Sequence, residues 1–354
     1  MSFKTEVNRV RRRIMRSITK NVGSSYTEPQ KGSLKIEDVK RVLIIRPNHR
    51  LGNQLLLTPL VQEVLNTFPN SEIDLFVKGG VAYPVFENYS RVSKIIQLPR
   101  KPFNNLFKYA KSWISVKSKS YDLVINGDKN SSSGRLLTNL AKAKLKIFGD
   151  VDLDIQKNFS DHMHISKYPI YNLRSNLKRL GFPENNKPLP LLDIKLSASE
   201  FEKGKVILDD IIKNHKKTIC IYTNATGDKC YSETWWETFY ERLKTEYPDF
   251  NIIEMLPIEN ISKINFKAPN FYSEDIREMA GIIKNTSIFI AADNGVMHLA
   301  SAALTPCVGF FSVTDENIYA PYGNGSVALN TNHTNIDDWI KAVNGILHWH
   351  NYQK

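Results

Sequence analysis

The chain has 354 residues, of which 42% are hydrophobic, 10% aromatic and 24% charged. These fractions exclude a disordered, collagenous or coiled-coil chain, and the length predicts two globular domains of about 150 residues each. The three cysteines, Cys220, Cys230 and Cys307, form no Cys-x-x-Cys pair, so we expect neither a disulfide framework nor a zinc site, in a reduced, cytoplasmic protein. The longest stretch without a charged residue, 294–314, contains too many polar residues to predict a membrane span.

The net charge of +12 is unevenly distributed, because residues 1–20 contain seven Lys and Arg residues against Glu6 alone and so carry +6. Apolar residues recur among these cations at helical spacings, and a helix with such a stripe suits an anionic membrane surface. A solvated arm, or one packed on its own domain, fits the same pattern. Nucleic acid is not expected as a partner, because we find no comparable basic stripe with interleaved aromatic residues elsewhere. The apolar positions are Phe3, Val7, Val10, Ile14 and Ile18.

The N-terminal 40 residues are expected to form a basic arm and a linker, since residues 21–33 are rich in Gly and Ser and lack apolar periodicity. A first domain then spans residues 41–187. It begins with an apolar strand, an amphipathic helix with Pro59 in its early turns, and a second strand, which together form one βαβ unit and imply a parallel sheet. A strand and a helix follow in the same pattern. The predicted strands are 41–46, 73–77 and 121–125, and the helices are 57–68 and 134–142.

A proline-rich stretch, 183–190, marks the boundary to a second domain, 188–354. There, apolar strands alternate again with amphipathic helices, so this half is a second Rossmann-like α/β unit. The final helix could return to the first domain. The predicted strands are 218–222, 251–255, 288–292 and 307–311, and the helices are 199–214, 233–246, 273–284, 296–303 and 335–348.

Ligands of open parallel sheets bind beyond the carboxyl ends of the strands, where this sequence places four polar loops. In the first, 46–54, Gly52 permits close backbone approach, but the loop lacks Gly-x-Gly-x-x-Gly, so no dinucleotide site is expected. A plain strand-to-helix connection explains this loop equally well. In the second, 223–232, Thr226 and Lys229 offer a hydroxyl and a cation suited to a diphosphate, although a lysine on a polar loop is usually only solvated.

The third loop, 291–300, ends an apolar strand at Asp293 and starts a helix of small residues after Gly295. The backbone N–H groups of residues 294–296 should point out of the helix start, where a phosphate fits. His298 lies in the first turn, and a histidine there is either a packing or capping residue or, as we favour in this setting, a phosphate ligand. The fourth loop is 312–316, with Pro-Tyr-Gly at 321–323 downstream.

These loops, in this order, resemble glycosyltransferase family 9, the ADP-heptose:lipopolysaccharide heptosyltransferases and their relatives. The resemblance covers about residues 42–347. The matching motifs are Leu43-Ile-Ile-Arg46 with Gly52-Asn53 and Thr58-Pro59, Lys229-Cys-Tyr-Ser232 with Trp236, Asp293-Asn-Gly-Val-Met-His-Leu-Ala300, and Phe311-Ser-Val-Thr314 with Pro321-Tyr-Gly323.

The resemblance implies an α/β protein with the GT-B fold, in which two Rossmann-like domains face a central cleft. The first domain would take the acceptor and the second, with the C-terminal helix, the nucleotide sugar. Catalysis would be inverting and would need no metal and no cofactor, because helix-start amides and cationic side chains would stabilise the departing diphosphate. We expect Lys229, Thr226 and the Asp293-Asn294-Gly295 turn to hold the diphosphate, with His298 supporting that turn or a phosphate oxygen. Glu259 is a further candidate for the nucleotide ribose.

The function implied is transfer of a sugar, heptose in the first instance, from ADP-heptose to a lipid-linked lipopolysaccharide or related glycan at the inner face of the cytoplasmic membrane. The alternative is a nucleotide-sugar- or glycan-binding protein that keeps the fold and has lost turnover.

The expected catalytic base is where this sequence departs from the family, which has a Gly-Asp turn where this chain has Gly52-Asn53. An amide cannot accept the acceptor's proton, so another group replaces it or the protein does not catalyse transfer. His49 is a suitable base, since a histidine ordinarily titrates near pH 6.5; a carboxylate not yet identified is the other option. Asn53 would then orient the acceptor, beside the loop residues Asn48, Arg50 and Gly52.

Overall fold

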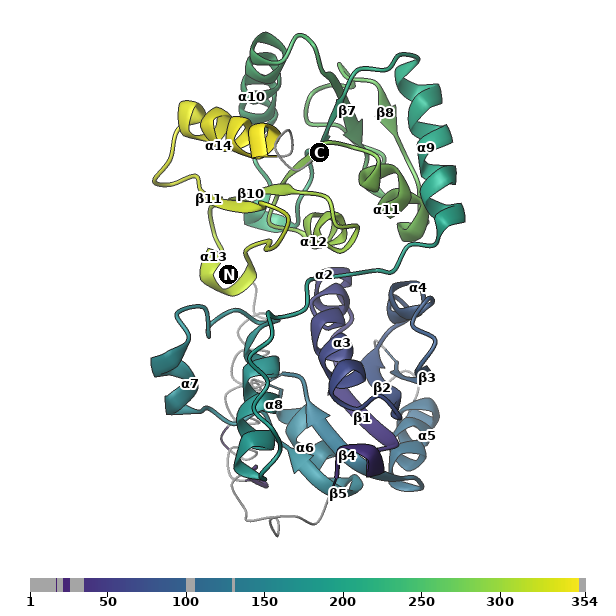
Figure 1. Ribbon diagram of the computed structural model, residues 1–354. Coiled ribbons are helices and arrows are strands. Elements are labelled where there is room, and N and C mark those ends of the chain that lie inside the picture. The colour runs from purple at the N-terminus through teal and green to yellow at the C-terminus, as the bar shows by residue number, and fades with distance from the viewer. Residues whose placement is uncertain (1–16, 18–21, 26–34, 100–105, 129–130, 350–354) are drawn as a thin grey trace. The chain divides into compact units, whose positions relative to one another are not determined.

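The computed structural model describes residues 17, 22–25, 35–99, 106–128 and 131–349 (Figure 1). The chain forms two compact units, of which the first comprises the chain up to His49 together with Pro59–Pro190, and the second comprises Arg50–Thr58 and Leu191–Lys354. Apart from Ser17, the basic arm of residues 1–20 lies outside the described residues, as does most of the predicted linker. None of the described helices is long and apolar enough to cross a membrane.

The described part of the first unit is built on a five-stranded parallel sheet in the order β3-β2-β1-β4-β5. The central strand β1 is buried from Val42 to Arg46, because its neighbours β2 and β4 flank it and helices cover the sheet (Figure 1). Its predicted bounds are confirmed. The strands are β1 (Arg41–Arg46), β2 (Glu72–Lys78), β3 (Val92–Leu98), β4 (Ser120–Asn126) and β5 (Lys142–Ile147).

One helix of this unit starts and ends earlier than expected. The Ser131 hydroxyl accepts a hydrogen bond from the Gly134 amide and so caps α6, while Ala141 is extended and ends it. Lys142, placed in the helix by the sequence analysis, begins β5. The alternation of lysines with apolar residues from Lys142 to Ile147 is the period of a strand. The helices of this part are η1 (Ile36–Asp38), α3 (Thr58–Thr67), α4 (Ala82–Phe86), α5 (Leu106–Lys117), α6 (Ser132–Leu140), α7 (Leu153–Asn158) and α8 (Tyr168–Arg179).

The segment after β1, expected to be a loop and one helix, contains two helices: α2 (Leu51–Leu55) and α3. Pro59 has no N–H to donate to the carbonyl of Leu55, and the Thr58 hydroxyl donates to that carbonyl instead, at 2.7 Å. The chain therefore turns between the helices, and α2 belongs to the second unit whereas most of α3 belongs to the first. The sequence analysis had assigned both to the first domain.

The second unit has a six-stranded parallel sheet, in the order β11-β10-β9-β6-β7-β8 within the described residues. The four strands predicted here are confirmed at their predicted bounds. The strands are β6 (Thr218–Tyr222), β7 (Asn251–Met255), β8 (Asn270–Phe271), β9 (Ile288–Ala292), β10 (Cys307–Phe311) and β11 (Val327–Asn330). The helices are α9 (Ala198–Ile212), η3 (Gly227–Lys229), α10 (Glu233–Glu246), α11 (Ile276–Lys284), α12 (Gly295–Ala302), α13 (Glu316–Tyr319) and α14 (Ile336–Trp349).

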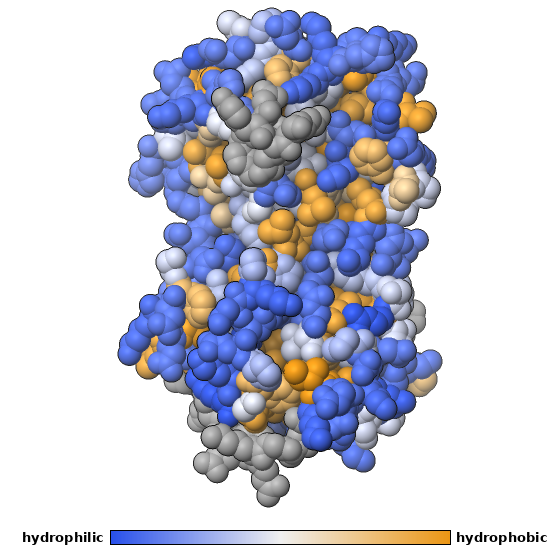
Figure 2. Space-filling view, in the orientation of Figure 1, coloured by the Kyte–Doolittle hydropathy of each residue, from blue (hydrophilic) through white to orange (hydrophobic). Residues whose placement is uncertain are grey.

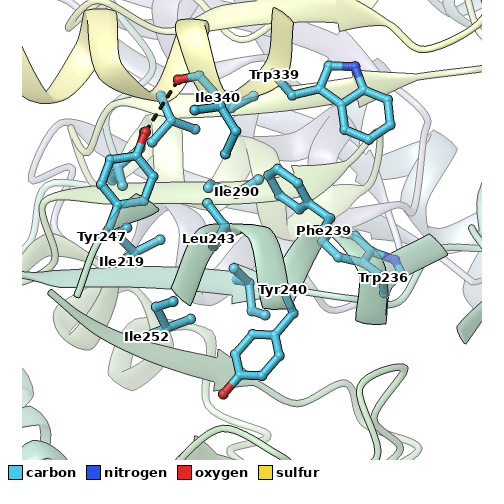
Figure 3. Packing of buried hydrophobic residues seen from close by; sticks show 14 of the residues in the cluster. Ile219, Trp236, Phe239, Tyr240, Leu243, Tyr247, Ile252, Ile290, Trp339 and Ile340 are labelled. Carbon is cyan, nitrogen blue, oxygen red and sulfur yellow. Dashed lines mark hydrogen bonds between the residues drawn. The ribbon is translucent and has the colours of Figure 1, made fainter. Parts of the chain in front are cut away.

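Helices α10 and α14 close one face of this sheet with a core rich in aromatic residues (Figure 3). The ring of Phe239 meets that of Trp339 edge to face at 5.8 Å, and the Tyr247 hydroxyl donates to the carbonyl of Ile340 at 3.3 Å. The last helix is thus part of the second unit, and the expectation that it could return to the first domain is wrong. Trp236, quoted as part of the donor-loop motif, is a fully buried member of this core.

Candidate functional site

The sheet of the second unit has one point where its strand order reverses. From β6 the chain runs to β7 and β8 on one side, and then returns to place β9 and β10 on the other side of β6. Loops leaving β6 and β9 diverge at such a point and open a crevice beyond the strand ends, which is where ligands of this fold class bind. The second and third polar loops are the loops that follow β6 and β9.

A lysine from one of these loops meets a carboxylate from the other. Lys229 of η3 forms an ion pair with Asp293, which directly follows β9, and the Thr314 hydroxyl from the loop after β10 donates to the same carboxylate oxygen. The Asp293 side chain is only 6% exposed, whereas that of Lys229 is 27% exposed. The Lys229 ammonium also lies 5.9 Å from the ring centre of Tyr319 in α13. The structure therefore fixes a partly exposed cation at the carboxyl edge of the sheet.

The start of α12 is held by Asn294, whose side-chain oxygen accepts hydrogen bonds from the amides of Val296 and Met297, both at 2.8 Å. Its amide group donates to the carbonyl of Asn224 at 3.0 Å and ties the helix start to the loop after β6. The Val296 N–H, predicted to face a phosphate, is therefore occupied by the cap. Of the three backbone N–H groups predicted to face a phosphate, this cap leaves those of Asn294 and Gly295 unused.

His298 lies in the first turn of α12, as predicted, but it is 97% buried and packs against α2. A Cβ atom added to Gly52 would come within 2.8 Å of His298 Cδ2, and one added to Gly295 would lie 3.3 Å from the Gly52 nitrogen. Glycine at both positions lets the two helix starts touch. The geometry favours the packing interpretation of His298 over direct contact with a phosphate.

A buried carboxylate, which the sequence analysis did not single out, joins the loops after β6 and β7. Glu254 of β7 accepts hydrogen bonds from the hydroxyls of Thr223 at 2.5 Å and Ser262 at 2.6 Å, and Thr223 accepts one from the Lys263 amide. Burial raises the pKa of the Glu254 carboxyl above its ordinary value, in spite of the two hydroxyl donors, which lower it. A charged residue within an otherwise apolar strand was the available sequence signal.

Two more predicted donor residues lie on exposed loop surface beside this centre. Thr226 is exposed and precedes Gly227, whose φ of +64° is a left-handed conformation that glycine adopts without strain. Glu259, after β7, is exposed, and its carboxylate lies 3.5 Å from the side-chain amide of Asn224. Both therefore border the loop that carries Lys229.

The residues predicted for the acceptor side are divided between the units. Asn48 and His49 end the first unit's part of the loop, and there the Asn48 amide donates to the carbonyl of Arg46 at 2.7 Å. Arg50 and Asn53 belong to the second unit with Gly52, where Arg50 directly precedes α2 and Asn53 lies within it. His49 and Arg50 are exposed, whereas Asn53 is partly buried.

Part of the second unit matches a known protein family. Residues 274–343, which include Asp293 and His298, match the family model described as "Glycosyltransferase family 9 (heptosyltransferase)". Over this segment the chain resembles glycosyltransferase family 9. It is similar to lipopolysaccharide heptosyltransferase 3 of Escherichia coli, at 19% identity over 291 residues that cover 78% of this chain and 85% of that protein.

Solved structures of this family share the fold. The family 9 glycosyl transferase of Veillonella parvula matches with a TM-score of 0.69 at 14% identity, covering 89% of this chain and 98% of the other. Escherichia coli heptosyltransferase WaaC with ADP gives 0.62 at 15% identity, covering 86% and 99%. The chain has two Rossmann-like units and the GT-B fold class, as the resemblance implied, and its likeness to family 9 supports a glycosyltransferase enzyme.

Proposed function

We propose that this glycosyltransferase transfers heptose from ADP-heptose to a lipopolysaccharide or related lipid-linked glycan, with inversion at the anomeric carbon. The names of its relatives support the substrate class, since one acts on lipopolysaccharide as a heptosyltransferase and another was solved with ADP. The single observation that carries the proposal is the Lys229–Asp293–Thr314 cluster at the reversal point of the second sheet.

Within this cluster we assign different roles to the cation and the carboxylate. Lys229 is partly exposed and has the charge to bind a diphosphate. Asp293 would repel a phosphate, so its role is to hold the lysine in place, together with the Thr314 hydroxyl. The amides of Asn294 and Gly295, at the positive end of α12, complete the diphosphate site, with Thr226 beside it and Glu259 placed for the ribose.

This arrangement stabilises the leaving group with fixed charge. As the glycosidic bond breaks, negative charge accumulates on the diphosphate, and a positioned ammonium and helix-start amides stabilise it without reorganising during the reaction. We therefore propose a reaction that requires no divalent cation, and turnover should survive addition of EDTA.

A second function, binding of a nucleotide sugar or glycan without transfer, is favoured by one observation. Asn53 occupies the position of the expected base, and an amide cannot accept the acceptor's proton. Catalysis in this chain requires a base elsewhere, and we propose His49, which precedes the second unit's part of the loop by one residue.

We also propose that residues 1–20 bring the enzyme to the inner face of the cytoplasmic membrane, where its lipid-linked acceptor would lie.

The donor assignment is tested by calorimetric titration of the full chain with ADP, UDP and ADP-heptose. Lys229→Ala should weaken ADP and ADP-heptose binding by about 1.5–3 kcal/mol, the range for a hydrogen bond to a charged group. The matched control is Lys205→Ala, because Lys205 is an exposed lysine of α9 at the opposite edge of the same sheet. Equal affinities of wild type and Lys229→Ala would reject the site, and tighter binding of UDP than of ADP would reject the donor.

A further inference from the structure

A second strongly basic segment lies in the first unit. Residues 88–121, between Glu87 and Asp122, contain no acidic residue and carry +8. Together with residues 1–20 this segment exceeds the whole net charge, so the remaining 300 residues sum to −2. This segment is easily overlooked in the sequence, because its cations are spread over residues 91–119. They are Arg91, Lys94, Arg100, Lys101, Lys108, Lys111, Lys117 and Lys119.

Helix α5 (Leu106–Lys117) lies in the second half of this segment, beside the edge strand β3 (Figure 1). One face of the helix is fixed to the sheet. The Ser112 hydroxyl donates to the carbonyl of Gln97 at 2.8 Å, and the ring of Trp113 meets that of Phe76 edge to face at 6.2 Å. Val116 is fully buried in the same core. This attachment determines which side of α5 faces solvent.

The outward face of α5 presents large apolar side chains between lysines. Phe107 is 82% exposed and Ile114 is 64% exposed, and Lys111 and Ser118 are exposed as well. These four positions are spaced i, i+4, i+7 and i+11, so they follow one another along a single line of the helix surface. Lys117 is exposed beside that line. The surface of both units in the view of Figure 2 is mainly hydrophilic, with separate hydrophobic patches, so an exposed phenylalanine and isoleucine on one line call for an explanation.

One acidic side chain near the end of this helix is already paired. Asp74 is close to its C-terminal end, but it accepts hydrogen bonds from Lys119 at 2.8 Å and from the Tyr121 hydroxyl at 2.9 Å. Lys94 of the neighbouring strand donates to Ser115 of the helix at 3.2 Å, and thereby adds a cation on that side. Among the described residues, neither Lys111 nor Lys117 forms a salt bridge, so their charges are not cancelled there.

We infer that α5 is a membrane-docking helix, which inserts Phe107 and Ile114 at the surface of an anionic bilayer while Lys111 and Lys117 contact lipid phosphates. A basic helix with an exposed apolar line and no acidic residue has the composition of helices that lie in the membrane interface. Charge complementarity selects anionic lipid as the occupant, because the segment is free of acidic residues over 34 positions. The inference is independent of the N-terminal arm, because α5 is a different segment of the first unit.

The experiment is co-sedimentation of the full-length protein with vesicles of phosphatidylglycerol and phosphatidylcholine, at low and high salt. The double variant Phe107→Ser/Ile114→Ser should lower the vesicle partition coefficient at least about tenfold, since two large apolar side chains leave the interface. Lys111→Gln should lower it about fivefold at low salt, because a basic residue near an anionic surface contributes about 1 kcal/mol. The matched control is Val206→Ser on α9, where the valine is 67% exposed.

Hydrogen exchange gives a second readout, in which vesicles should slow exchange in peptides of α5 and leave those of α9 unchanged. The inference would be overturned if the double variant had the wild-type partition coefficient, or if Val206→Ser lowered the partition coefficient as much as the double variant does. So would binding of a 20-base DNA that depends on Lys111 but not on Phe107, since that would identify a nucleic-acid surface. These variants keep residues 1–20 intact, so their vesicle binding tests α5 separately from the arm. The result also does not depend on whether Lys229 binds the donor.

Discussion

Two buried carboxylates at the carboxyl edge of the second sheet have different surroundings. Asp293 and Glu254 are both buried carboxylates, but Asp293 faces a partly exposed lysine, whereas Glu254 is satisfied by two hydroxyls. Only the first arrangement leaves a charge that a ligand can use. Motif spacing identified Asp293, and it could not identify Glu254, whose partners Thr223 and Ser262 come from two different loops.

His49 is the proposed catalytic base. We predict that His49→Ala lowers turnover about 10²- to 10⁴-fold, the usual contribution of a general base. Donor affinity should not change, because the donor residues lie on other loops. Initial rates with ADP-heptose and acceptor at saturation measure this. His215→Ala is the control, because His215 is exposed at the opposite edge of the second sheet.

The outcome also decides between the two proposed functions. Near-normal turnover by His49→Ala would exclude His49 and point to a carboxylate. If the wild type is inactive and Asn53→Asp creates turnover, the protein is a binding protein that has lost its base.

At the scale of elements, the sequence predicted the second unit better than the first. Strands β6, β7, β9 and β10 are short apolar runs with polar loops behind them, which is a pattern that local sequence determines. Strand β5 was missed, although its lysines alternate with the period of a strand, because its first residue, Lys142, was assigned to the end of the preceding helix. The break between α2 and α3 and their assignment to different units depend on tertiary contacts that no local pattern reveals.

Helices α2 and α12 pack closely at Gly52. We therefore predict that Gly52→Ala destabilises the protein by about 1–3 kcal/mol, the usual cost of overpacking. The added methyl would lie 2.8 Å from Cδ2 of His298, which is buried and cannot move away freely. Urea unfolding measures the effect. The control is Gly345→Ala in α14, where no atom lies within 4 Å of the added Cβ, and a gain of about 0.5–1 kcal/mol is expected.

His298→Ala should partly restore the stability of Gly52→Ala, because it removes the side chain that the methyl would strike. Equal unfolding midpoints for Gly52→Ala and wild type would show that α2 does not pack on α12 in solution.

For the molecule as a whole, both cationic segments belong to the first unit. Residues 23–25, which follow the basic arm, are bound to it, since Arg135 donates to the Gly23 carbonyl at 2.5 Å and the Ser25 amide donates to Asp150 at 2.7 Å. These described residues are therefore fixed on the unit that carries α5. The sequence alone located the charge of the arm, but it could not show this attachment, because Ser25 and its partner Asp150 are 125 residues apart.

Deletion of residues 1–20 tests the role of the arm, and we predict that it lowers partitioning onto phosphatidylglycerol vesicles steeply at low salt. The deletion removes +6, and each basic residue near an anionic surface contributes about 1 kcal/mol. Raising the salt should narrow the difference between the deleted and full chains, because the Debye length falls from about 10 Å at 0.1 M to about 3 Å at 1 M. Binding that ignores both the deletion and the salt would exclude the arm as a membrane anchor. If the deletion alone has no effect and binding still falls with salt, the charge that matters is that of residues 88–121.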